Sequence, residues 1–204
     1  MIEPPSQTRI INMAASMVGS TARISSIDDG GSLATNARAL WPIILLDAMA
    51  YPWTFTISRA QLNAGADAPL FGYKNFYSLP ADCLIWLPPS HEDGEVFYEA
   101  VQEEGKLLSN AEAPLPVRFI SKARAENVGL WPAYFVKAFA AELAAYLAEP
   151  LTQSANMAGR MRDQADDFWR QAKRRDALAR GRKTRIGAVR NSRWATAGLR
   201  RARV

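Results

Sequence analysis

Four sets of side chains in this sequence could take part in catalysis, and each fits an ordinary structural role better. His91 could act as a general base, but it lies between Pro-Pro-Ser and Glu-Asp-Gly, which are loop-forming sequences. Cys83 could act as a nucleophile, but it falls in an apolar run with no basic residue nearby to activate it. The acidic pairs at 28–29 and 103–104 could act as paired carboxylates, but both adjoin glycines in turn-like sequences. We therefore predict no catalytic residue and a protein that is not an enzyme.

Cofactor, metal and membrane signals are also missing from the sequence. The single cysteine and the single histidine exclude a disulfide framework and a His/Cys-rich metal site, and there is no phosphate-binding or dinucleotide-binding glycine motif. The longest charge-free stretches, 10–22 and 48–58, are shorter than the roughly 20 apolar residues of a spanning helix. Residues 1–5 contain no basic region followed by an apolar stretch, so we expect no secretory signal. These features predict no cofactor, no metal, no membrane association and a soluble, intracellular protein.

The charge of the chain is unevenly distributed. Residues 1–158 contain 10 basic and 16 acidic side chains, whereas residues 159–204 contain 15 basic and 4 acidic ones. The net charges of the two parts are therefore −6 and +11. A mildly acidic body with a strongly basic end indicates a negatively charged partner for that end.

Residues 179–204 are the segment whose composition most suggests a function. They hold nine basic residues and no acid, and arginines outnumber lysines eight to one. The planar guanidinium favours paired hydrogen bonds to carboxylates or phosphates. Three interpretations remain open: a disordered solubilising tail, direct DNA binding, and docking on an acidic protein groove. The docking candidates are Arg180, Arg182, Lys183, Arg185, Arg190, Arg193 and Trp194.

Apolar periodicity divides the chain into helical and β parts. Helices are expected at 6–18 and from Leu33 to Ala48, where Pro42 should kink or split the second one. Strict alternation over Trp53–Ser58 predicts a half-buried strand. Further strands are expected at 76–79, 83–87, 96–101, 106–108 and 117–120, with a hairpin turn at 103–105.

We therefore predict an α+β, mainly α, fold: a helical bundle with an inserted β lobe and a basic C-terminal tail. Residues 1–52 and 121–178 form the helical body, residues 53–120 the β lobe, and residues 179–204 the docking tail.

The helical period returns after Pro132. Four large apolar residues step by four through an alanine-rich run that has few charges before Pro150, so this helix should be buried on more than one side. The second side belongs either to the core of the same chain or to a neighbouring subunit. The subunit-interface candidates are Phe135, Phe139, Leu143 and Leu147. A longer, charged helix is expected over 151–178, with its inner stripe running from Met157 to Ala172.

Several of these segments, in this order, resemble the tubular tail protein A family, the head-to-tail adaptors of tailed bacteriophages. The similar segments are Ile10–Phe55, Phe71-Gly72-Tyr73, Tyr77–Leu84, Trp131–Phe135 and the alanine-rich helix ending in Leu147–Thr152. Together they extend over residues 10–175. Each segment is weakly specific by itself, but their order and spacing are fairly specific. Pro42 within the second helix and the Gly/Arg-rich tail depart from what the family would lead us to expect.

The resemblance implies a structural protein of the virion. It implies a ring of twelve copies below the portal vertex, a central channel for double-stranded DNA, and contacts with the portal protein ring and with a downstream tail or nozzle protein. It brings no catalytic residues to this chain. The location implied is the head-to-tail junction, after synthesis in the host cytoplasm.

Two other functions stay open. A DNA-binding module would use the basic tail together with one face of the 157–172 helix, and its affinity would fall steeply with salt. A peptidoglycan hydrolase would need an acid pair in a cleft, for which the sequence gives no indication.

Overall fold

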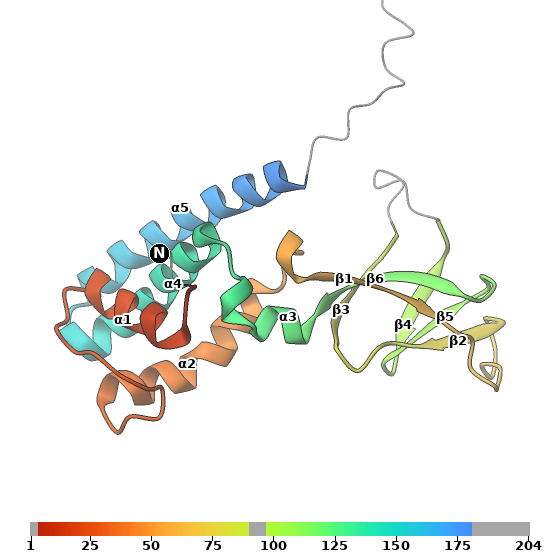
Figure 1. Cartoon of the computed structure of the whole chain (residues 1–204), viewed down its shortest axis with the longest axis horizontal. Helices are drawn as coiled ribbons and strands as arrows, with labels where there is room; N and C mark the ends of the chain where they lie inside the picture. The colour runs from red at the N-terminus through yellow and green to blue at the C-terminus, as the bar shows by residue number, and fades with distance from the viewer. Residues whose placement is uncertain (1–3, 90–96, 181–204) are drawn as a thin grey trace, which may run out of the picture.

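The computed structural model describes residues 4–89 and 97–180, and it contains both helices and antiparallel β-sheets. Four long helices lie at one end of the molecule and six strands at the other (Figure 1). The coarse prediction of an α+β protein is therefore confirmed.

The helical part is built around one central helix. The long helices are α1 (Gln7–Met17), α2 (Ser32–Ala48), α4 (Ala133–Thr152) and α5 (Ala155–Ala179). Helices α1, α2 and α5 all pack against α4. The short helices are α3 (Lys122–Glu126) and two 3-10 turns, η1 (Thr54–Thr56) and η3 (Val128–Leu130).

The strands form two small antiparallel sheets with a shared apolar core. They are β1 (Ile57–Leu62), β2 (Asn75–Ser78), β3 (Cys83–Leu87), β4 (Ala100–Glu103), β5 (Lys106–Ser109) and β6 (Leu115–Ser121). One sheet has the order β1-β6-β3 and the other β2-β5-β4. Side chains of both sheets, including Tyr77, Leu107 and Phe119, are buried together between them.

The strand predictions at 76–79, 83–87, 106–108 and 117–120 are confirmed to within two residues. The strand expected over 96–101 is β4, which begins at Ala100, and residue 96 lies outside the described part of the chain. The predicted turn at 103–105 joins β4 to β5 in register. Its residues Glu104 and Gly105 have φ values of 47° and 73°, and a two-residue hairpin turn of this type requires such positive values.

The strand predicted over Trp53–Ser58 is wrong at its start. Thr54–Thr56 form a 3-10 turn, and β1 begins only at Ile57. Trp53 is buried in the helical core, where its indole N–H donates to the carbonyl of Ala48 at 2.8 Å. The Thr56 hydroxyl donates to the Trp53 carbonyl at 2.8 Å, which closes the turn. Burial of the large indole among the helices therefore overrides the local alternation.

Two helices continue past a proline. Helix α2 is not split: it runs without interruption through Pro42, which is exposed. Helix α4 continues through Pro150 and ends at Thr152, and the next residue, Gln153, has a left-handed φ of 53°. The next helix begins at Ala155, capped by the Ser154 hydroxyl, so the expected start at residue 151 is wrong. Each proline lacks the backbone N–H that would donate a helical hydrogen bond. Packing against the core keeps both helices continuous in spite of that loss.

Candidate interaction sites

The residues that could do chemistry have structural roles where the structure describes them. Cys83 begins β3, and burial together with the adjacent Asp82 charge raises the pKa of its thiol. A thiol with a raised pKa is a poor nucleophile. The Asp29 carboxylate accepts the backbone N–H of Ser25 at 2.8 Å and that of Ser26 at 3.2 Å, which closes the loop before α2. His91 lies outside the described residues.

Within 4–89 and 97–180, no group of three or more His, Cys, Asp or Glu side chains is placed to hold a metal ion. In the same part of the chain, no helix is long and apolar enough to span a bilayer.

The four subunit-interface candidates lie inside this chain. Phe135, Phe139, Leu143 and Leu147 each have 0% of their surface exposed. Phe135 packs against Trp53 and Trp169, with ring centroids 5.1 and 5.4 Å away. These side chains have no surface left for a second copy, so the interface interpretation is corrected in favour of the core. Helices on several sides of α4 supply the second buried face that the sequence indicated.

Of the seven docking candidates, only Arg180 lies in the described residues; 182, 183, 185, 190, 193 and 194 lie outside them. Arg180 caps the C-terminal end of α5 and makes contacts within the chain. Its guanidinium donates to the carbonyl of Pro52 and, at 3.1 Å, to the carboxylate of Asp176. It also lies over the ring of Tyr51, 5.2 Å from the centroid. Arg180 therefore binds the end of α5 to the body of the protein.

Asp176 is the centre of this arrangement, which we call the α5 latch (Asp176, Arg180, Thr54 and Tyr134). The Asp176 side chain is fully buried. One of its oxygens accepts hydrogen bonds from the Thr54 backbone N–H at 3.0 Å, the Thr54 hydroxyl at 2.6 Å and the Tyr134 hydroxyl at 3.1 Å. The other accepts from Arg180. A buried carboxylate is tolerated only when it is paired and hydrogen-bonded in this way.

The latch also perturbs Tyr134. Burial raises the pKa of the Tyr134 phenol, and the neighbouring Asp176 charge raises it further. The phenol therefore stays protonated and keeps donating to Asp176 throughout the neutral range. The latch joins three separate parts of the chain: α5, α4 and the turn that leads into β1.

A basic surface covers the outer side of the last turns of α5. Lys173, Arg174 and Arg175 are exposed there, and Leu178 is exposed to 81%. Lys173 lies over the Tyr51 ring at 5.5 Å. The guanidinium groups of Arg174 and Arg175 make no ion pair or hydrogen bond with any described residue. Two guanidinium groups without a partner among residues 4–89 and 97–180, beside an exposed leucine, suit a partner with both carboxylates and apolar side chains.

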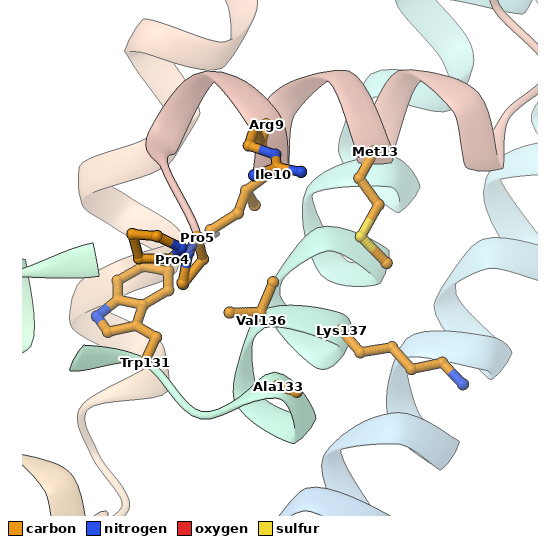
Figure 2. Close-up of a pocket in the computed structure, with 9 residues that line it drawn as sticks. All are labelled: Pro4, Pro5, Arg9, Ile10, Met13, Trp131, Ala133, Val136 and Lys137. Atoms are coloured by element: carbon orange, nitrogen blue, oxygen red, sulfur yellow. The ribbon is translucent and has the colours of Figure 1, made fainter. Parts of the chain in front are cut away.

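An apolar pocket of about 820 Å³ lies between the start of α1 and the start of α4 (Figure 2). Pro5 and Met13 line one side, and Trp131 and Val136 line the other. Arg9 lies at its edge, whereas the Lys137 ammonium points away from the pocket and lies over the Phe168 ring, 4.0 Å from the centroid. A pocket of this size and lining suits an apolar side chain or a small apolar ligand.

Two features of the structure, the Asp176–Arg180 pair and the apolar tip of the β1–β2 loop, have a signal in the sequence that our interpretation missed. Asp176 stands at i−4 from Arg180, a spacing that places both on one helix face. The loop between β1 and β2 contains Leu70 and Phe71 between Pro69 and Gly72, an apolar pair in a turn-forming context. They are exposed to 99% and 85%.

Comparison with known proteins adds no relative. No protein-family model matches the chain, and no curated protein matches it.

Proposed function

We propose that this chain is a head-to-tail adaptor of a tailed bacteriophage: a structural protein that forms a ring of twelve copies between the portal and the tail. In this proposal α1, α2, α4 and α5 act as a helical bundle and the strands as an inserted lobe. The ring gives double-stranded DNA a channel and meets a downstream tail or nozzle protein at its other face. The protein is made in the host cytoplasm and is located at the junction in the virion.

The observation that carries the proposal is the α5 latch together with the basic surface beside it. The latch fixes the last turn of α5 to the body, and the chain continues from there into residues 181–204, which contain eight further basic side chains and no acid. A docking segment that starts from a fixed point loses less entropy on binding than one that starts from a mobile end. Twelve such segments would act together on one portal ring, so weak single contacts add up by avidity.

The acidic character of residues 1–158 supports a channel that does not bind the DNA passing through it. Residues 1–158 carry a net charge of −6. Like charge lowers non-specific adhesion of the DNA backbone, which favours passage.

The test is to mix the purified protein with its cognate portal ring and to count bound copies by electron microscopy. A chain that ends at Arg180 keeps the latch and removes only the segment beyond it. We expect stoichiometric rings with the full chain and their loss with the shortened chain. Arg174→Glu with Arg175→Glu should weaken ring formation, while Arg160→Glu, at the other end of α5 and equally exposed, should not.

The second candidate is a DNA-binding module, and the exposed guanidinium groups of Arg174 and Arg175 favour it. It predicts tight binding to duplex DNA that weakens steeply as salt rises, in the absence of any portal. Salt-sensitive DNA binding without portal binding would overturn the adaptor proposal.

A further inference from the structure

We infer that the exposed loop tip at Leu70 and Phe71 of one copy inserts into the apolar pocket between α1 and α4 of the next copy. This inference rests on the proposed function in that it names the contact between neighbours of the ring. It needs no portal, so it can be tested separately.

The loop presents an apolar tip from a fixed base. Leu70 and Phe71 are the two most exposed large apolar side chains in the described part of the chain. At the first end of the loop, the Gly65 N–H donates to the Phe76 carbonyl at 2.9 Å. A side chain at Gly65 would overlap the Phe76 ring, because a Cβ there would lie 2.0 Å from it. At the second end, the Lys74 N–H donates to the Asn110 side chain at 3.0 Å.

The pocket can bury the apolar side chains that the loop tip exposes. Its volume of about 820 Å³ is ample for two apolar side chains, and its walls include Met13, Trp131 and Val136. Opposite charges lie on the two sides as well: Asp67 is in the loop, and Arg9 is at the edge of the pocket. Apolar contact at the centre with opposite charges at the rim is the usual composition of a protein interface.

The contact must form between copies. The loop between β1 and β2 lies at the far end of the β part, whereas the pocket belongs to the helical part at the other end of the molecule (Figure 1). A tip that binds a different patch on its neighbour makes a head-to-tail interface, and such an interface closes into a ring when its rotation allows. A contact between the tip and the pocket therefore joins two copies of this chain, and we assign the pocket to a second copy.

The test uses two variants that each damage one side of the contact. The tip variant carries Leu70→Ser and Phe71→Ser and keeps an intact pocket. The pocket variant, Ala133→Glu, places a carboxylate in the pocket at the first residue of α4, where a negative charge suits the helix end. Its matched control is Ala155→Glu, at the exposed first residue of α5 and away from the pocket.

Sedimentation velocity should show that the parent chain and Ala155→Glu associate equally. The tip variant should associate about 100-fold more weakly, because each buried apolar side chain contributes about tenfold or more. The pocket variant should be similarly impaired. A mixture of the two variants should form a one-to-one pair and nothing larger, since the tip of one copy and the pocket of the other are both intact.

Four results would overturn the inference: a monomeric parent chain at every attainable concentration, a tip variant that associates like the parent, a mixture that stays monomeric, or loss of association in the pocket variant alone. The last would identify another occupant of the pocket. Portal binding is measured in a separate experiment from self-association. Tip-dependent association without portal binding would support the inference and overturn the proposed function. Portal binding without tip-dependent association would overturn the inference alone.

Discussion

The indole ring of Trp41 stacks on that of Trp131, with centroids 5.6 Å apart and planes that differ by 9°. The two residues occupy the same place in the two Leu-Trp-Pro sequences, at 40–42 in α2 and at 130–132 just before α4. Both rings also contact Phe139, at 4.7 and 4.9 Å. The stack therefore joins α2 to the beginning of the central helix, beside the apolar pocket that Trp131 helps to line.

Replacing Trp41 or Trp131 with Ala should lower the free energy of unfolding by about 3–5 kcal/mol, because each change leaves a cavity in the core. The double variant should lose less than the sum, with a coupling of about 0.5–1.5 kcal/mol from the stacked pair. Urea unfolding of the four proteins measures this. Phe71→Ala, at an exposed ring, should change stability by less than about 0.5 kcal/mol. Strict additivity of the two tryptophan changes would contradict the coupling.

Asp176→Ala should destabilise the protein by about 2–3 kcal/mol, because it leaves the Thr54, Tyr134 and Arg180 donors without their acceptor. The loss stays below that of a fully buried pair since the Arg180 side chain is 38% exposed. Asp167→Ala on the same helix is the control, because its ion pair with Arg170 is exposed and should contribute under about 1 kcal/mol. Hydrogen exchange should speed up at Thr54 and in the last turn of α5. Equal effects of the two changes would argue against the latch.

Glu142→Gln should raise stability at neutral pH. Burial raises the pKa of the Glu142 carboxyl, so its ionised form is disfavoured in the folded protein. The stabilising contribution of its protonated form is complete below the ordinary value of 4.5 and is lost as the pH rises through the folded pKa. Glutamine keeps an oxygen for the Trp169 indole N–H, which lies 3.2 Å from Glu142.

The gain from Glu142→Gln should therefore shrink as the pH falls towards 4.5, and unfolding at a series of pH values will show it. Glu149→Gln, an exposed change on the same helix, should give no such pH-dependent gain. A gain that does not depend on pH would rule out ionisation of Glu142 as its cause.

Asp82→Ala should weaken the link between β3 and α3 by about 1 kcal/mol, similar to the loss of a helix cap. The Asp82 carboxylate accepts hydrogen bonds from the Ser121 hydroxyl and, at 2.7 Å, from the Ala123 N–H, and these lower the pKa of the carboxyl. Its contribution is present above the ordinary value of 3.8 and is lost as the pH falls through the folded pKa.

Unfolding of the Asp82→Ala variant and its parent should differ at pH 6 and converge in strong acid. Asp67→Ala, in the exposed β1–β2 loop, is the control and should leave the unfolding curve unchanged. A difference that persists in strong acid would mean that the charge of Asp82 is not what stabilises the link.

The sequence by itself determined the types of most elements. The strand at Cys83–Leu87 and the hairpin turn at 103–105 follow from local chemistry, because a short apolar run and a glycine-containing turn sequence are properties of neighbouring residues. The same is true of the helix that contains Phe135 and Leu147, whose apolar residues recur at helical spacing. These features need no knowledge of the remaining chain.

Only the tertiary structure decided which surfaces are buried and which are free. Trp53 is not part of the expected strand, because helices far along the chain enclose its ring. Phe135 belongs to the core and Leu70 to the surface, although both are apolar, since burial depends on what packs against a side chain and not on its type. Asp176 and Thr54 lie 122 positions apart. Their contact exists only because folding brings the end of α5 onto the turn before β1, a proximity that no local pattern in the sequence encodes.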